Sequence, residues 1–261
     1  MSESENIKII KTFLANAPPG EYEQCTAALR SIVNDEDLIN RARSETLKTW
    51  AEEECIVVDV EDHKVIICKE ACQRDGIYVD PVTSSLITYD FESRIATPIG
   101  DQANMSDFAK ELQEELTAYA KNAYKENAAA GVYDTNNGIV IVLRGSSISL
   151  KNFRTGKTVA KYTLSKSGSL EGKIVSIQHF FEKGNAVCQH DGDCNTTCSF
   201  GDAKSVVKAI RTFEDEWLAD YKTTLEKIGT NVLFQLRRKF PYSKQKINWQ
   251  QEITVGGGMK C

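Results

Sequence analysis

The chain lacks most of the features that catalytic, secreted and membrane-spanning proteins need. Its 261 residues include three histidines, and no G-x-S-x-G, H-E-x-x-H, Walker A or G-x-G-x-x-G pattern occurs. No apolar run approaches the roughly 18 to 20 residues that span a bilayer, and MSESENIKIIK at the N-terminus lacks the apolar core of a signal peptide. We therefore expect a cytoplasmic protein that is not an enzyme.

Basic residues are fewer than acidic ones. The chain has 32 Lys and Arg against 37 Asp and Glu, which gives a formal net charge of -5. Because nucleic-acid binders neutralise phosphates with a clearly basic face, this balance argues against that class. The exception is the stretch from Asn231 to Gln251, which contains five cations and no acid and for which we expect an anionic partner. The five cations are Arg237, Arg238, Lys239, Lys244 and Lys246.

Cysteine is sparse, with eight residues in the whole chain. This is too few for a secreted disulfide scaffold, and in a reducing compartment we expect mostly thiols. Zinc could use the group at 188–198, but structural zinc sites usually have two tight pairs separated by a longer loop. We therefore expect no metal and no other cofactor, and keep a zinc-dependent protein as an alternative. That group consists of Cys188, His190, Cys194 and Cys198, whereas Cys25, Cys55 and Cys68 are interpreted as small buried apolar residues.

Three short helices are predicted in the first fifty residues. The first carries Ile7, Ile10, Phe13 and Leu14 at helical spacing and ends at Pro18-Pro19-Gly20. The second covers residues 21–33, and the third begins near Asp35, where acids suit the positive end of a helix dipole, and runs to about residue 50. Tight connections between short helices favour a small antiparallel bundle.

Alternating apolar runs after the bundle predict strands. Short runs at 55–98 predict a small strand-rich region, a helix is expected around 105–130, and longer runs predict an antiparallel sheet. The turn signals of that sheet are Asn137-Gly138, Gly156 and the Ser/Gly-rich segment after it. His179 lies in an alternating strand beside two phenylalanines, and we interpret it as a structural core histidine.

A long helix follows, with Asp202 as its expected N-cap and one apolar seam along more than six turns. We expect this helix to lie across the sheet. Strands covered by a helix, without βαβ alternation, indicate an α+β fold.

Several motifs resemble those of the F-actin capping protein alpha subunit family. QHFFEKGNAV at 178–187 resembles its strand-turn signature, and FQLRRKFP at 234–241 resembles its second signature, although Gln235 stands where the family often has lysine. NAPPGEY at 16–22, KNFRTGK at 151–157 and INW at 247–249 are similar to further family segments, and GIYVDP at 76–81 is a weaker match.

The resemblance implies a non-enzymatic cytoskeletal protein that pairs with a capping protein beta subunit and blocks the barbed end of actin filaments. It implies three stalk helices, one sheet shared by both subunits, a long helix on that sheet and a C-terminal amphipathic tentacle. It also implies, as further partners, proteins with capping-protein-interaction motifs and anionic phosphoinositides. The actin contacts that it implies are Arg237, Arg238, Lys244, Lys246 and Trp249, with Lys239 as an additional one.

The expected organisation has six segments, and other functions stay open. The segments are 1–53 (helical stalk), 54–104 (small strand and loop region), 105–130 (helix), 131–200 (central sheet), 201–232 (long helix) and 233–261 (tentacle). One alternative is an adaptor whose basic tail binds a membrane or a regulator, but Pro241 interrupts the apolar stripe that such a helix needs. A solvated helix end would also explain an isolated pair of arginines.

Overall fold

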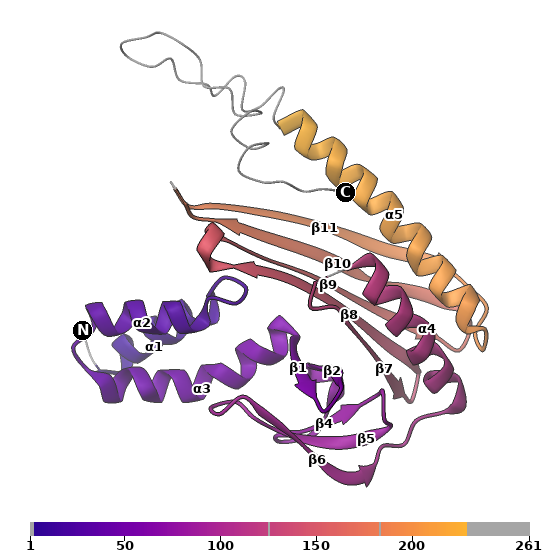
Figure 1. The fold of residues 1–261 in the computed structure, drawn as a ribbon, viewed down its shortest axis with the longest axis horizontal. Coiled ribbons are helices and arrows are strands. Elements are labelled where there is room, and N and C mark those ends of the chain that lie inside the picture. Colours follow the sequence, from indigo (N-terminus) through magenta and orange to yellow (C-terminus); the bar gives the residue numbers. More distant parts are fainter. Residues whose placement is uncertain (1–2, 125, 183, 229–261) are drawn as a thin grey trace. The chain divides into compact units, whose positions relative to one another are not determined.

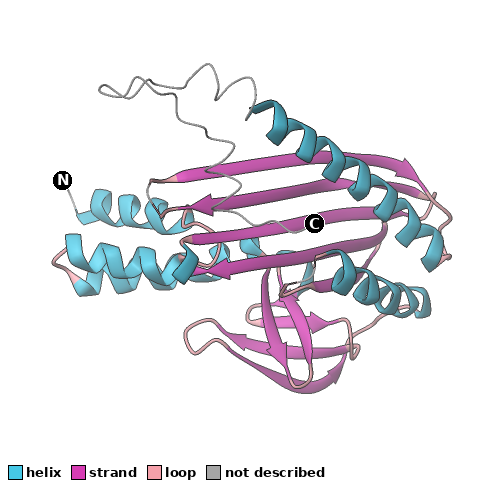
Figure 2. Ribbon diagram, turned by 45° about the horizontal axis from the view of Figure 1, so that its top comes forward, coloured by secondary structure: helices cyan, strands magenta, loops and turns pink. Residues whose placement is uncertain are grey.

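The computed structural model describes residues 3–124, 126–182 and 184–228, and the chain divides into two compact units between Ile210 and Arg211. Within the described residues, helices and strands are mixed and all strand pairs are antiparallel (Figures 1 and 2). This confirms the predicted α+β class. The helices are α1 (Glu3–Ala15), α2 (Tyr22–Ile32), α3 (Glu36–Glu54), α4 (Asp107–Ala123) and α5 (Ala203–Lys227), with the 3₁₀ turns η1 (Lys69–Ala71) and η2 (Leu150–Asn152).

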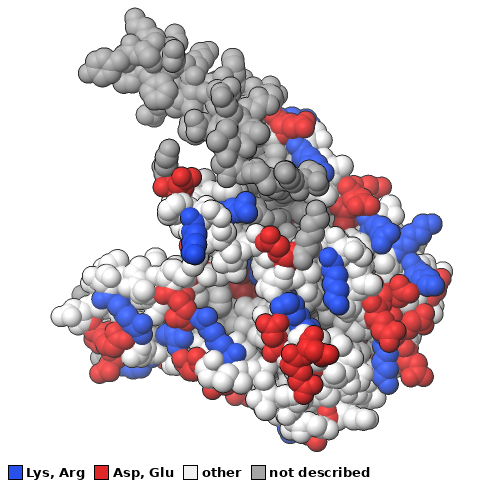
Figure 3. All heavy atoms as spheres, viewed as in Figure 1, with Lys and Arg blue, Asp and Glu red and all other residues white. Residues whose placement is uncertain are grey.

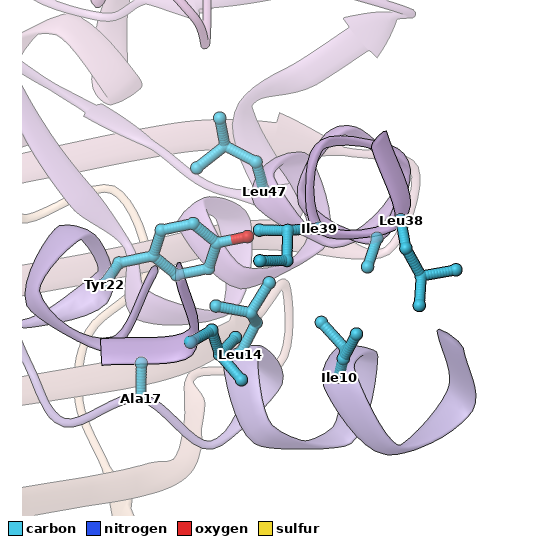
Figure 4. Close-up of a cluster of buried hydrophobic side chains, with 9 residues drawn as sticks. Ile10, Leu14, Ala17, Tyr22, Leu38, Ile39 and Leu47 are labelled. Carbon is cyan, nitrogen blue, oxygen red and sulfur yellow. The ribbon is translucent and has the colours of Figure 1, made fainter. Parts of the chain in front are cut away.

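Helices α1 to α3 form the predicted bundle around a core of their own, shown in Figure 4. Leu14 and Ile39 are fully buried there, and the ring of Tyr22 lies 4.7 Å from that of Trp50. Asp35 caps α3 by accepting a 3.0 Å hydrogen bond from the backbone N–H of Leu38. The helix runs four residues past the predicted end at residue 50, as far as Glu54. Phe13, predicted for the apolar face of α1, is 45% exposed.

Two small sheets follow the bundle, as the short apolar runs predict. The first is a two-stranded hairpin of β1 (Ile56–Val60) and β2 (His63–Ile67). The second has the order β3-β4-β5-β6. Its strands are β3 (Cys72–Arg74), β4 (Ile77–Asp80), β5 (Ser85–Asp90) and β6 (Ile95–Gln102).

The largest sheet has the order β11-β10-β9-β8-β7, so each strand pairs with its neighbour in sequence. Helix α4 packs on β7 and β8, and its N-cap Ser106 donates a 3.0 Å hydrogen bond to Asp134 at the end of β7. The turn predicted at Asn137-Gly138 joins β7 to β8. The strands are β7 (Ala129–Thr135), β8 (Gly138–Ser149), β9 (Arg154–Ser165), β10 (Ser169–Phe180) and β11 (Ala186–Thr197).

The turn predicted at Gly156 is wrong. Gly156 lies inside β9 and pairs with Ser147 on one side and Gln178 on the other. A Cβ at this position would lie 2.2 Å from Oε1 of Gln178, so glycine leaves room for a cross-strand side chain. The chain reverses earlier, through η2 and Phe153, whose φ of 51° is left-handed. Sequence alone does not separate a glycine that turns the chain from one that makes room.

Helix α5 begins as predicted, because Asp202 accepts a 3.2 Å hydrogen bond from the backbone N–H of Ser205. Ala203, Val206 and Ile210 in its first turns are fully buried. The residues from Arg211 onward belong to the second unit, in which Trp217 and Tyr221 stack at 5.8 Å. The segment predicted to carry the apolar seam is thus one continuous helix, which ends at Lys227.

Candidate interaction surfaces

The outer edge of β11 is the first candidate surface. β11 is 12 residues long and pairs only with β10 in the described part of the chain. At 3.3 to 3.4 Å per residue this edge is roughly 40 Å long. Its backbone donors and acceptors on the outer side are available to another strand, which makes an unprotected edge a template for pairing.

The opposite edge of the sheet is different. β7 contacts β2 and η1 of the same chain, and the Tyr133 hydroxyl donates a 3.5 Å hydrogen bond to the carbonyl of Ile66. Tyr133 is 4% exposed, whereas Val187 on β11 is 61% exposed. The chain therefore covers one edge of the sheet itself and leaves the other edge uncovered over the described residues.

The exposed face of β11 carries two acidic side chains. Asp191 and Asp193 point to the exposed side of the strand, and Asp191 forms an ion pair with Lys173 of β10. The hydrogen bond from Lys173 and the positive charge of that lysine hold the pKa of Asp191 below its ordinary value. On the face drawn in Figure 3, acidic and basic side chains of the described residues are interspersed. On that face, the described residues therefore form no large patch of a single charge.

A groove beside the sheet is the second candidate surface. It has a volume of about 780 Å³ and lies between the bundle and the turn after β10. Ile9 and Phe13 on α1 form its exposed apolar wall, at 56% and 45% exposure. Its lining is Lys8, Ile9, Thr12, Phe13, Asn16, Pro18, Glu21, Cys25, His179 and Asn185.

A buried polar network closes the floor of this groove. Glu21 accepts hydrogen bonds at 2.6 Å from Nδ1 of His179 and from the hydroxyl of Thr155. The second ring nitrogen of His179 lies 3.0 Å from Oδ1 of Asn185. His179 is 6% exposed, in agreement with its interpretation as a core residue. The network fixes the entry to α2 against β9 and β10.

The cysteine and histidine group at 188–198 does not converge. Cys188, His190 and Cys194 all lie in β11, so Cys188 and Cys194 are separated by six residues, or roughly 20 Å, of extended strand. Within the described residues, no three His, Cys, Asp or Glu side chains are arranged to hold a metal ion. The geometry gives the zinc alternative no support.

The predicted actin contacts lie outside the described residues. This applies to Arg237, Arg238, Lys239, Lys244, Lys246 and Trp249. None of the described helices is long and apolar enough to cross a membrane. Sequence reasoning missed the Glu21–His179 pair, although both residues lie in the motifs NAPPGEY and QHFFEKGNAV.

Comparisons with known proteins match nearly the whole chain to proteins that share one description. A family model described as F-actin capping protein alpha subunit matches residues 10–257. F-actin-capping protein subunit alpha of Dictyostelium discoideum is 28% identical, over 96% of this chain and 95% of the relative. The protein of that name from Gibberella zeae is 26% identical, over 98% of this chain and 99% of the relative.

A solved structure supports the same fold. The homodimeric actin capping protein alpha subunit from Plasmodium berghei matches with a TM-score of 0.73 and 21% sequence identity. The match covers 93% of this chain and 99% of that one. Since the family model spans most of the sequence, the chain belongs to the F-actin capping protein alpha subunit family.

Proposed function

We propose that this chain is the alpha subunit of a heterodimeric capping protein that binds the barbed ends of actin filaments and blocks subunit addition and loss without severing. The observation that carries the proposal is the family match over residues 10–257. Capping requires affinity and steric blockage, and no bond is made or broken. The protein is proposed to work in the cytoplasm, at the cytoskeleton.

Pairing with a beta subunit is proposed to use the edge of β11. A second strand on this edge would continue the five-stranded sheet into the partner. Such an addition would satisfy the outward-facing backbone groups of every second residue of β11, and packing of the partner adds buried apolar area. The exposed Val187 supports the choice of this edge, because a large apolar side chain gains by leaving water.

Actin contact is proposed for the C-terminal tentacle, residues 233–261. Five cations in the stretch from Asn231 to Gln251 would steer the protein onto an acidic surface, and Trp249 would add affinity by leaving water. Capping-protein-interaction motifs and anionic phosphoinositides are proposed as regulators. The six-segment division of the chain, in which the tentacle is the last segment, stays a prediction.

Two measurements test the proposal. The chain is coexpressed with a capping protein beta subunit, and the mass of the purified complex is determined by light scattering. The complex is then added to filament seeds in a pyrene-actin elongation assay. A one-to-one complex that stops barbed-end growth is expected. A soluble dimer of two copies of this chain would overturn the heterodimer, and unchanged elongation at saturating complex would overturn capping.

A further inference from the structure

Two cysteines that the capping proposal does not use lie together at the junction of the bundle and the sheets. Cys55 directly precedes β1 and Cys68 directly follows β2, so both flank the Ile56–Ile67 pair that ends the hairpin ladder. The two thiols are close enough to influence each other's ionisation, and both residues are fully buried. The adjacency of the two thiols, 13 positions apart in sequence, follows from the hairpin register.

Each cysteine is held in place by its own element. Cys55 ends α3 in the left-handed conformation, with φ of 50°, and its thiol lies 3.6 Å from the carbonyl oxygen of Glu52. Cys68 caps η1, and its sulfur lies 3.9 Å from the hydroxyl of Tyr133 on β7. A bond between the two sulfurs would join the end of the bundle to the turn that contacts the large sheet.

We infer that Cys55 and Cys68 form a dithiol that closes into an intrachain disulfide on reaction with a small disulfide such as oxidised glutathione. The inference is independent of the proposed capping function. The Cys55 thiolate attacks one sulfur of the small disulfide, which forms a mixed disulfide and releases one small thiol. Cys68 then attacks the Cys55 sulfur of the mixed disulfide and releases the second small thiol. The protein loses two electrons and two protons, and the oxidant gains them.

The surroundings give the two thiols different roles. The neighbouring Cys68 thiol lowers the pKa of Cys55, and the nearby cation of Lys161 lowers it further, although burial opposes both. Burial raises the pKa of the Cys68 thiol well above its ordinary value. Cys55 is therefore the attacking thiol and Cys68 the resolving one, since the thiolate is the nucleophile. Because both sulfurs are buried, an oxidant reaches them only through local opening.

Peptide mapping tests the inference directly. The full-length chain is incubated under native conditions with a series of ratios of oxidised to reduced glutathione, quenched with acid, blocked with N-ethylmaleimide and digested with trypsin without reduction. Trypsin cleaves after Lys48, Lys64 and Lys69, so the disulfide links peptide 49–64 to peptide 65–69. We expect this linked pair at oxidising ratios and its separation on reduction.

Matched variants distinguish this site from general thiol oxidation. Cys55→Ser should abolish the linked pair, whereas Cys194→Ser, which removes another buried thiol, should leave it unchanged. We also expect the half-exposed Cys188 to be modified before the pair closes. If Cys55→Ser fails to fold, the map of the unsubstituted chain still decides the matter.

Three results would overturn the inference. In the first, both peptides are recovered as blocked thiols at the most oxidising ratio while Cys188 is already glutathionylated. In the second, the linked pair forms only in denaturant. In the third, Cys68 is linked to a cysteine other than Cys55.

Discussion

Nδ1 of His179 donates a 2.6 Å hydrogen bond to the carboxylate of Glu21, which lies 158 positions earlier in the chain. The hydroxyl of Thr155 donates to the same carboxylate oxygen. These three residues come from NAPPGEY, KNFRTGK and QHFFEKGNAV, three of the motifs that carry the family resemblance in the described part of the chain. The motifs therefore have a structural role, which is to join the helical bundle to two strands of the central sheet.

Removing the Glu21 carboxylate should destabilise this junction. Glu21→Ala would leave a buried imidazole and a buried hydroxyl without their acceptor, because both side chains of the hydrogen-bonded pair are almost fully covered. Leaving a buried hydrogen-bond donor unsatisfied costs about 1 to 3 kcal/mol. The free energy of unfolding is measured by urea titration of the purified complex followed by circular dichroism, at fixed protein concentration.

Glu23→Ala is the matched control for this substitution. Glu23 lies in the first turn of α2, two residues after Glu21, pairs with Arg43 of α3 and Arg94 of the β5–β6 turn, and has a side chain that is 40% exposed. Exposed pairs contribute less than about 1 kcal/mol. Equal destabilisation by the two substitutions would contradict the role assigned to the Glu21–His179 pair.

Local features of the fold were predictable from the sequence. The sequence predicts Asp202 as the N-cap of α5 and the acids at Asp35 at the start of α3, because capping depends on residues within one turn. Gly156 was misassigned because its role depends on Gln178, which a neighbouring strand places beside it. The Glu21–His179 contact was missed for the same reason, since no local pattern encodes a pairing over 158 positions.

The candidate surfaces, too, are only partly predictable from the sequence. The family resemblance implies a sheet shared with a partner, but only the pairing order shows that the free edge is β11 and that β7 is covered by β2 and η1. The basic stretch from Asn231 to Gln251 was read from charge alone. Its residues lie outside the described part of the chain, so their assignment to actin binding stays a prediction.

A pH dependence is expected from His63 in the β1–β2 hairpin. Nε2 of His63 lies 2.7 Å from Oδ2 of Asp80, which is 1% exposed. Burial opposes protonation of His63, but its hydrogen bond to Asp80 and the charge of that carboxylate raise its pKa above the ordinary value. The stabilisation is therefore fully present below the unfolded pKa of about 6.5 and is lost as pH rises through the folded pKa.

His63→Gln should accordingly destabilise the protein more at pH 5.5 than at pH 8. The difference between the two pH values is expected to be about 1 kcal/mol in the free energy of unfolding, measured by urea titration. Lys64→Gln serves as the control, because it changes the next residue of the same strand and removes an exposed ion pair with Asp59. A cost of His63→Gln that is the same at both pH values would refute the assignment.

The edge of β11 should be sensitive to a charge at Val187. Val187→Lys places an ammonium on the edge where the beta subunit is proposed to pair, and burying that charge without a partner is costly. We expect at least tenfold weaker subunit association in analytical ultracentrifugation. Ile95→Lys is the control, because Ile95 is equally exposed, at 60% against 61%, on the edge of another sheet. Equal weakening by both substitutions would contradict pairing through β11.

Loss of the paired arginines should weaken capping and leave subunit pairing intact. Arg237→Ala combined with Arg238→Ala removes two of the five cations between Asn231 and Gln251. A desolvated and paired interface arginine contributes roughly 1 to 3 kcal/mol, so the double substitution should weaken barbed-end affinity by at least tenfold. Affinity is measured from pyrene-actin elongation as a function of complex concentration, and pairing from the mass of the complex.

The control variant also loses two positive charges, but at positions outside the tentacle. Arg74→Ala combined with Lys166→Ala removes two exposed cations from the first unit. A general electrostatic attraction to the filament would be weakened by both double substitutions to a similar extent, because it depends on total charge. A specific contact by the tentacle predicts that only the Arg237 and Arg238 pair matters. Full capping by the variant that combines Arg237→Ala with Arg238→Ala, at equal complex concentration, would show that the two arginines do not contact actin.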